Sequence, residues 1–459
     1  MRVTLVSPAA PGAAPDLTGR WPPLGLAYLT AALEAHGHDA TLIDAHGFAL
    51  DEEATVARCV ASSPELIGLS IYSPQIWAVA KLARALKQQL PEVPVLGGGP
   101  HATAMPHQTL VELPAIDYLL VGEADASLPT FVSFLEGHAS RGEVPGLGYR
   151  TEGKGVVADG LPSAPPFGAG PSRPWLRQQK PYSPYFSLIL GPLDSIVASR
   201  GCPYSCAFCS HMYAGCRPRG AESVVAEIAE LRQRGIRNLD VQDDTFTAFR
   251  SRVLHVCERL ASLGVGMRFR VRSRADTLDP TLLRSLRRAG VHVISLGLES
   301  GSQTMLSAMA KGISVEQGEA ACRYAREAGL LVTTSWVIGF PGETPDTVAD
   351  TVAFVRRVRP DVATFHRLQP FPGTAVYEQA KSGGLLRGDW SVADHAPWVQ
   401  LDWLGSGEEL DHVVAEAQRR CYQGGVGGLL RVAVRTAGRF DWQTWRAAGR
   451  LVWSLAARR

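Results

Sequence analysis

Two series of short β-rich segments that alternate with helical segments organise this chain, and between them lies a stretch in which neither pattern continues. In the first series, the predicted strands cover residues 3–6, 40–43, 66–71, 93–96 and 118–121. The predicted helices cover residues 24–36, 76–89 and 128–135, where apolar residues recur at helical spacing. Such alternation is typical of a parallel sheet covered by helices on both faces. We therefore expect an α/β fold in which residues 1–141 form a doubly wound, Rossmann-like domain.

Residues 142–187 are predicted to be a linker, because they are rich in Pro, Gly and Ser and this composition disfavours regular structure. A second series of predicted strands covers residues 195–199, 238–241, 268–271, 291–298, 331–338 and 363–368. Six βα units predict a partial (β/α)6 barrel of the TIM type over residues 188–385. Its chemistry is expected at the carboxyl ends of the strands. Residues 386–459 are expected to be a mainly helical C-terminal region.

Composition excludes several classes of protein. With 46% hydrophobic and 20% charged residues and a net charge of +2, the chain of 459 residues is neither disordered nor basic enough to suggest a nucleic-acid partner. It has no signal peptide and no run of about 20 apolar residues, so a cytoplasmic protein is expected. Residues 419–459 carry nine arginines against one acid, Asp441. This C-terminal tail is read as a solvated helical face, with peripheral membrane contact as the alternative.

The run Cys202-Pro203-Tyr204-Ser205-Cys206-Ala207-Phe208-Cys209 follows the first predicted barrel strand. A loop there would gather three thiolates, and three ligands on a four-iron cube leave one iron with an open position. The alternative is a zinc site with His211 as the fourth ligand. The eight cysteines of the chain are too few for a disulfide scaffold. The remaining five are interpreted as buried, inert thiols: Cys59, Cys216, Cys257, Cys322 and Cys421.

This cysteine motif resembles the signature of the radical S-adenosylmethionine (SAM) enzymes, and residues 1–136 resemble the cobalamin-binding domain that precedes it in one large subfamily. The resemblance implies three cofactors: a [4Fe-4S] cluster on Cys202, Cys206 and Cys209, SAM chelated at the open iron, and cobalamin. It also implies an external electron donor of the flavodoxin or ferredoxin type.

The same resemblance assigns SAM-binding roles by position. The run Asp243-Asp244-Thr245 stands where the family places a backbone edge against the amino group of SAM, although two aspartates replace the usual small residues. Whether backbone or side chain contacts SAM is therefore open. Glu299 matches a residue that bonds the ribose hydroxyls, and Lys311 matches a cation that faces the SAM carboxylate. The remaining candidates are Phe208, beside the adenine, together with Arg274 and Ser335.

Three loops at the carboxyl edge of the first sheet resemble corrin-binding loops. The predicted cobalamin-binding residues in them are Ser70, Tyr72, Gln75, Gly97, Gly98, Gly99, Gly122 and Glu123. The loop Ser7 to Gly12 lacks the D-x-H-x-x-G run that supplies a cobalt-binding histidine. His46, in a near match after the second strand, is interpreted as a loop residue. We therefore expect cobalamin without a histidine ligand.

The resemblance implies that one SAM methylates the cobalamin and a second yields a 5′-deoxyadenosyl radical. The favoured function is C-methylation of an unactivated carbon in a small-molecule or peptide natural-product intermediate, inside a cavity that excludes water. A cyclase, ring-contracting or oxidative enzyme that uses cobalamin without methyl transfer is the first alternative. A methylthiotransferase is disfavoured, because only Cys59 precedes Cys202. From another class, a non-catalytic cobalamin sensor or carrier would not need the three cysteines.

Overall fold

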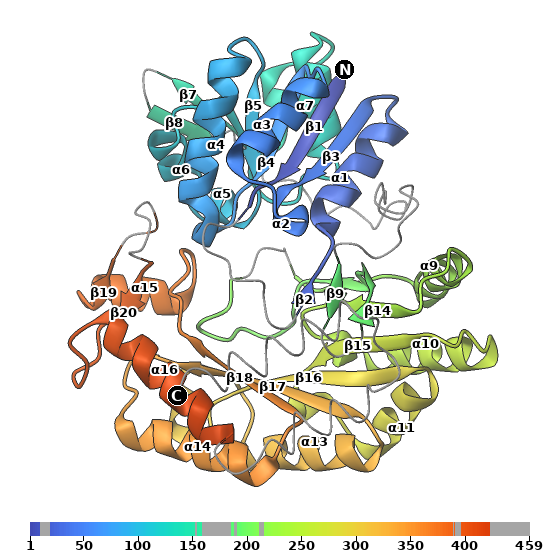
Figure 1. Ribbon diagram of the computed structural model, residues 1–459, viewed down its shortest axis with the longest axis vertical. Coiled ribbons are helices and arrows are strands. Elements are labelled where there is room, and N and C mark those ends of the chain that lie inside the picture. The colour runs from blue at the N-terminus through green and yellow to red at the C-terminus, as the bar shows by residue number, and fades with distance from the viewer. Residues whose placement is uncertain are drawn as a thin grey trace.

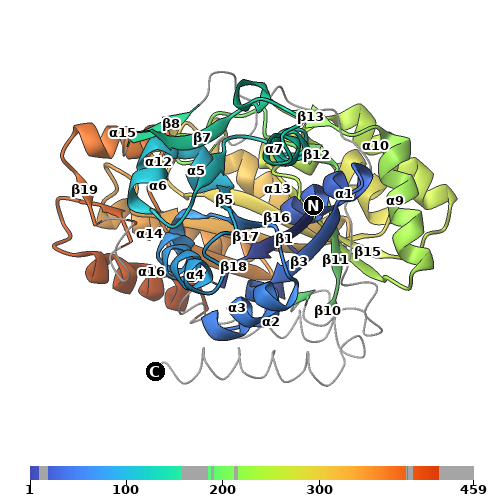
Figure 2. The ribbon, with the colours of Figure 1, turned by 90° about the horizontal axis from the view of Figure 1, so that it is seen from above.

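The computed structural model describes residues 1–9, 19–151, 154–157, 185–187, 191–210, 215–388, 390 and 396–422. Two α/β domains stand one above the other, with the N-terminal domain at the top of Figure 1 and the barrel below it. Seen from above in Figure 2, the N-terminal domain covers the middle of the barrel. This arrangement confirms the two predicted α/β units and their order along the chain.

The N-terminal sheet has the strand order β3-β1-β4-β5-β6-β7-β8. Its first five strands are parallel and correspond to the five predicted ones: β1 (Arg2–Ser7), β3 (Asp39–Asp44), β4 (Leu66–Ser70), β5 (Val95–Gly98) and β6 (Tyr118–Leu120). Side chains alternate between the two faces of the sheet. Val3 and Leu5 pack on one face against α1 (Leu24–Ala35) and α7 (Ser127–Leu135). On the other face, Ile67 and Leu69 pack against the remaining helices: α3 (Glu52–Ala61), α4 (Ile76–Gln89), α5 (Pro100–Ala104) and α6 (Pro106–Glu112).

The sheet continues into residues that the sequence predicted to be an irregular linker. Strands β7 (Leu147–Thr151) and β8 (Lys154–Val157) form an antiparallel hairpin that pairs with β6. Val144 and Leu147 are fully buried in the core beneath α7, so this segment has the apolar content of a strand. The expectation of irregular structure therefore fails for residues 147–151 and 154–157. Most of the remaining predicted linker lies outside the described residues.

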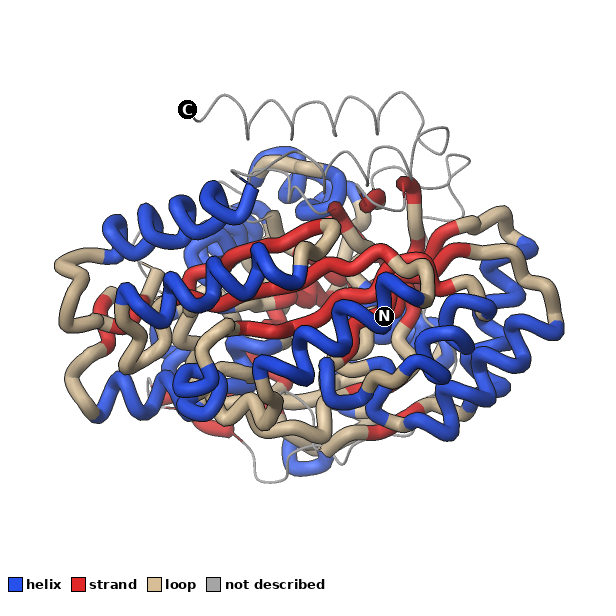
Figure 3. The backbone as a smooth tube through the Cα atoms, turned by 90° about the horizontal axis from the view of Figure 1, so that it is seen from below, coloured by secondary structure: helices blue, strands red, loops and turns tan. Residues whose placement is uncertain are grey.

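The barrel consists of one parallel sheet with the order β11-β14-β15-β16-β17-β18, as the six predicted units require. Its strands are β11 (Asp194–Ile196), β14 (Asn238–Val241), β15 (Arg268–Ser273), β16 (Val291–Glu299), β17 (Leu331–Ile338) and β18 (Val362–Arg367). The main connecting helices are α9 (Ala221–Gln233), α10 (Arg250–Ser262), α11 (Pro280–Arg288), α13 (Val315–Glu327) and α14 (Pro345–Val358), with the short α12 (Gln303–Ala308) after β16. Figure 3 shows these helices from below, over the outer face of the strands.

Alternation along the barrel strands separates the core from the interior. In β15, Phe269 and Val271 are buried toward the helices, whereas Arg270 and Arg272 are half-buried on the opposite side. Arg272 Nη2 donates to Asp240 on β14 at 3.0 Å. The inside of the barrel is therefore polar and the outer layer is the hydrophobic core.

The described part of the C-terminal region closes the open edge of the barrel. It follows α15 (Ala375–Ser382) and contains the two-stranded β19 (Leu386–Arg387) and β20 (Trp398–Val399), and α16 (Gly407–Tyr422). On α16, the Gln418 side chain accepts from Phe365 N at 3.0 Å and donates to Ala363 O at 2.9 Å. It thereby satisfies backbone groups at the free edge of β18. No helix of the described residues is long and apolar enough to cross a membrane, and the basic tail from residue 423 lies outside them.

Candidate functional site

The carboxyl ends of the two parallel sheets face each other. A cavity of about 470 Å³ lies at this junction. Its wall includes Ser7, Ser70 and Gly122 from the N-terminal domain, together with Val197 and Arg200, which follow the first barrel strand. Carboxyl ends of parallel strands are the usual place for ligands in both fold types.

The three motif cysteines lie on the loop that joins β12 (Ser199–Arg200) to β13 (Arg217–Pro218). Gly201 has φ +82°, and a Cβ there would lie 2.1 Å from the carbonyl oxygen of Gly215, so only glycine fits where the loop closes. Ala207 anchors the middle of the loop, because its N–H donates to Met309 O at 2.9 Å and its carbonyl accepts from Val376 N at 2.9 Å. The loop is therefore held at both its base and its centre.

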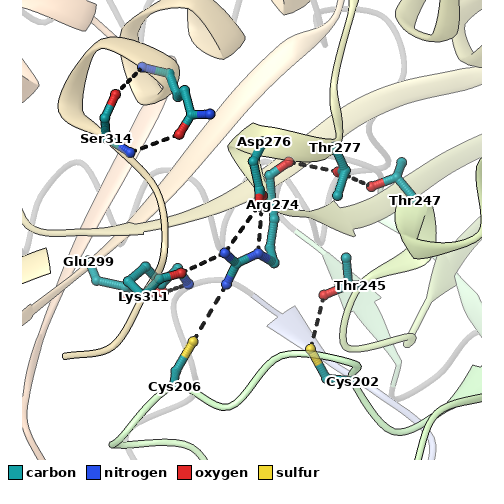
Figure 4. A network of polar contacts seen from close by, with 11 residues as sticks. Cys202, Cys206, Thr245, Thr247, Arg274, Asp276, Thr277, Glu299, Lys311 and Ser314 are labelled. Atoms are coloured by element: carbon teal, nitrogen blue, oxygen red, sulfur yellow. Dashed lines mark hydrogen bonds and ion pairs between the residues drawn. The ribbon is translucent and has the colours of Figure 1, made fainter. Parts of the chain in front are cut away.

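Arg274 and Lys311 surround the thiol of Cys206 with positive charge (Figure 4). Arg274 Nη1 lies 3.5 Å from Cys206 Sγ, and Nη2 donates to the Lys311 carbonyl at 2.5 Å. A hydrogen bond from Cys209, aided by the charges of Lys311 and Arg274, lowers the pKa of Cys206 to about 6. Cys206 thus favours the thiolate form, whereas the same hydrogen bond and burial raise the pKa of Cys209.

Glu299 and Lys311 form a buried ion pair beside this loop. Lys311 Nζ donates to Glu299 Oε1 at 2.8 Å, and their side chains are only 7% and 9% exposed. Burial alone would lower the pKa of Lys311, but the charges of Glu299 and Cys206 outweigh it and raise the pKa. Glu299 follows a register shift in β16 and has φ +64°, a conformation that is rare for a residue with a side chain. Phe208 lies below the pair, with its ring centre 5.7 Å from Lys311 Nζ.

The three candidate residues after β14 lie in three different environments. Thr245 faces the cysteine loop, because its Oγ1 lies 3.4 Å from Cys202 Sγ. Asp244 is exposed. The carboxylate of Asp243 is fully buried and accepts from Ala198 N at 2.6 Å and Ser199 Oγ at 2.5 Å. The Asp243 side chain therefore holds the strand leading into the cysteine loop, which leaves only its backbone to contact a ligand.

Two further observations concern residues near this loop. Ser335 is half-buried on β17 and lies opposite Gly297 in register. Tyr204, which the sequence reasoning did not single out, lies under Arg274, with the guanidinium carbon 3.7 Å from the ring centre. Its position inside the cysteine motif was the available signal. Among the described residues, no three His, Cys, Asp or Glu side chains converge as ligands of a single metal ion do. His211, the proposed fourth zinc ligand, lies outside that part of the chain.

All eight predicted cobalamin-binding residues line the cavity at the sheet edge: Ser70, Tyr72, Gln75, Gly97, Gly98, Gly99, Gly122 and Glu123. Tyr72 is 50% exposed. Gly99 has φ +104°, and a Cβ there would lie 3.1 Å from the Ile71 carbonyl, so the loop needs glycine at this position. A Cβ on Gly97 would instead meet Leu119 Cδ2 at 2.6 Å inside the core. Gly97 is therefore required for packing of the sheet as well.

Two histidines near the cavity differ in their environments. His46 lies in the short helix α2 (Ala45–Phe48) and not in a loop, because the Asp44 carboxylate accepts from Gly47 N at 2.9 Å and caps that helix. It lines the cavity. His101 is buried, and its Nδ1 lies 2.9 Å from Ser73 Oγ. It links two of the cavity loops, and burial lowers its pKa to about 4.

Comparison with known proteins matches residues 14–132 to the B12 binding domain and residues 196–355 to the Radical SAM superfamily. An uncharacterised methyltransferase of Pyrococcus horikoshii is 31% identical over 405 residues, which cover 84% of each chain. An anaerobic magnesium-protoporphyrin IX monomethyl ester cyclase of Rubrivivax gelatinosus is 27% identical, over 91% of this chain and 77% of its own. One solved structure that matches is the radical SAM methyltransferase TsrM from Kitasatospora setae, with cobalamin and a [4Fe-4S] cluster bound. Its TM-score is 0.71 at 21% sequence identity, and the match covers 91% of this chain and 84% of the TsrM chain.

Proposed function

Because this chain belongs to the radical SAM enzymes that carry an N-terminal B12-binding domain, we propose that it transfers a methyl group to an unactivated carbon of a small-molecule or peptide intermediate. The chain is a cobalamin-dependent radical SAM enzyme, and its cofactors are a [4Fe-4S] cluster, SAM and cobalamin. The observation that carries the methyl-transfer proposal is the single cavity whose wall combines the glycine-rich sheet edge with the residues leading into the cysteine loop.

The cysteine loop fits an iron–sulfur cluster. Its donors are soft thiolates, which suit iron–sulfur chemistry. Cys202, Cys206 and Cys209 would hold the cluster, and Arg274 and Lys311 would offset its negative charge.

The cavity edge also fits cobalamin. A Cβ at Gly99 would lie 3.1 Å from the Ile71 carbonyl oxygen, so glycine at this position lets two loops of the cavity edge pack closely together. The inner wall of the cavity is apolar and includes Leu5, Leu26, Leu96 and Leu128. Tyr72 and Gln75 also line this cavity and would contact the cofactor.

When bound, the cluster and SAM supply a 5′-deoxyadenosyl radical, and cobalamin supplies a methyl group. The chain's own residues would position these groups. Lys311 would face the SAM carboxylate and Glu299 the ribose hydroxyls, since the pair is fixed beside the cysteine loop. Backbone groups of Asp243 to Thr245 would bind the amino group, because the Asp243 carboxylate is engaged elsewhere. The two opposed sheet edges would exclude water from the radical.

Labelled SAM tests the proposal directly. Anaerobically reconstituted enzyme, a chemical reductant or a flavodoxin-type donor, methyl-labelled SAM and candidate intermediates would be combined, and the products analysed by mass spectrometry. We expect 5′-deoxyadenosine together with a product that carries the labelled methyl group. Deoxyadenosine with an unlabelled, cyclised or oxidised product would favour the reaction class of the cyclase relatives. Protein that binds cobalamin but neither iron nor SAM would indicate a carrier.

A further inference from the structure

A short ribbon frames the cysteine loop. Strands β12 and β13 pair antiparallel, and Arg200 is the register partner of Arg217. The cysteine loop leaves the ribbon after Arg200 and returns to it before Arg217. Contacts that hold these two arginines in place therefore also hold both ends of the loop that carries the cluster ligands.

Both arginines bind carboxylates of the other domain. Arg200 Nη1 donates to Glu123 Oε2 at 2.7 Å and to Asp125 Oδ2 at 3.0 Å, and its Nη2 donates to Asp125 Oδ1 at 2.7 Å. Arg217 donates to the other oxygen of Glu123. The Arg200 guanidinium also lies over the ring of Tyr28, 5.1 Å from its centre. One glutamate thus joins both strands of the ribbon.

The centre of this network is buried, whereas the outer side chains of Asp125 and Arg217 are 26% and 24% exposed. The side chains of Arg200 and Glu123 are 9% and 8% exposed. Two-pronged arginine–carboxylate bonds fix orientation as well as distance, and a point charge such as lysine does not reproduce this geometry. A shift of one domain along the other with the contact still closed would leave buried charges mispaired, which is strongly unfavourable. The contact therefore holds one defined arrangement of the two domains.

The carboxylates belong to the loop that lines the candidate cobalamin cavity. Gly122, Glu123, Asp125 and Arg200 all contribute to the cavity wall. Gly122 has φ +87°, and its N–H donates to Thr103 Oγ1 at 3.0 Å, which ties the loop to α5 beside the glycine-rich run. The same few residues therefore contact the cavity on one side and the base of the cysteine loop on the other.

We propose that Arg200 and Arg217, through Glu123 and Asp125, form the joint that sets the distance between cobalamin and the iron–sulfur cluster. The inference rests on the proposed function, because it presumes both cofactors. Radical formation and methyl donation must reach the same carbon, and a misplacement of about 1 Å can cost about a hundredfold in rate. Arg200 and Arg217 are positioning residues, since they act through the two loops.

The distance between the cofactors is measurable in the full-length holoenzyme. Cob(II)alamin and the reduced cluster each carry an unpaired electron, so pulsed dipolar EPR gives the distribution of distances between them. We expect one narrow distribution in the parent enzyme. Arg217→Met should at least double its width, while the iron content stays at the parent level and deoxyadenosine formation without substrate stays within about twofold of the parent. Glu123→Gln should widen the distribution as well, although it also changes the cavity wall. Arg200→Lys should give an intermediate width, because it keeps the charge and loses the two-pronged geometry.

Lys87→Met is the matched control. Lys87 pairs with Asp117 within the N-terminal domain, and its side chain is 24% exposed, as is that of Arg217, so the substitution removes a paired cation of the same exposure away from the domain contact. Its distance distribution should equal that of the parent.

A parent-like distribution in both Glu123→Gln and Arg217→Met would overturn the joint and leave the proposed function intact. If Glu123→Gln loses cobalamin, Arg217→Met decides alone, because Arg217 is not among the residues that line the cavity. A parent enzyme that binds no cobalamin would refute the proposed function, and this inference with it.

Discussion

Removal of the Lys311 ammonium is the sharpest test of the buried pair beside the cysteine loop. In Lys311→Met the chain length is nearly preserved, but the Glu299 carboxylate loses the cation that donates to it at 2.8 Å. Both side chains are more than 90% buried. Loss of one partner of such a pair typically costs about 3–5 kcal/mol, because the remaining charge stays out of water without compensation.

Calorimetry of the cluster-free protein measures this cost. For a domain of about 150–250 residues, 1 kcal/mol shifts the melting temperature by about 2–4 °C, so the barrel transition of Lys311→Met should fall by about 6–20 °C. Adding Glu299→Gln to that variant removes the isolated charge and should restore most of the loss, because replacing both partners of a buried pair is often nearly neutral. Arg357→Met is the control, because it disrupts an exposed ion pair with Glu319 on the same barrel. It should change the melting temperature little.

The variant that combines Lys311→Met with Glu299→Gln decides whether the two side chains are coupled. If the decrease in melting temperature of the double variant equalled the sum of the decreases of the two single variants, the two side chains would not be coupled. The argument from burial would then be refuted. In the loaded enzyme we also expect each single variant to weaken SAM binding roughly ten- to a hundredfold while the iron content persists, as loss of a charge-assisted bond implies. Unchanged SAM affinity with failed substrate conversion would assign the pair to the substrate instead.

Three further predictions follow from the site. Alanine at any one of the three motif cysteines should abolish the cluster and deoxyadenosine formation, as measured by iron analysis and product chromatography. Cys216→Ala should retain both, since that thiol bonds only the Gly201 carbonyl among the described residues. Loss of the cluster in Cys216→Ala, or its retention in a motif-cysteine variant, would contradict this assignment. The EPR spectrum of cob(II)alamin should lack coupling to a protein imidazole, and a nitrogen pattern lost in His46→Ala would contradict this. The fold keeps His101 neutral down to a pKa of about 4, whereas the unfolded chain binds its proton below about pH 6.5, so stability should fall as the pH is lowered from about 6.5 to about 4. Urea unfolding of His101→Gln should show a weaker fall, and an identical pH dependence would refute the assignment.

Much of the fold could be predicted because its signals are local. The five strands and three helices expected in the first domain are present, with β5 two residues later than predicted. The barrel strands also carry a local signal, because buried apolar residues recur at every second position, as Phe269 and Val271 do in β15. The hairpin of β7 and β8 was missed because nearby Pro and Gly dominated the composition, although Val144 and Leu147 marked a buried segment.

The candidate site divides in the same way. The sequence pointed to the cysteine loop and the glycine-rich edge through short motifs whose chemistry depends on residue type and separation along the chain, and the family resemblance added Glu299 and Lys311 as candidates. Only the tertiary structure decided where the carboxylates point. Asp243 turns into the barrel to hold Ala198 and Ser199, and Glu123 faces two arginines that lie 77 and 94 positions further along the chain. A buried charge takes the direction in which a partner compensates its lost hydration, and such partners are brought together by packing between domains and not by neighbouring sequence.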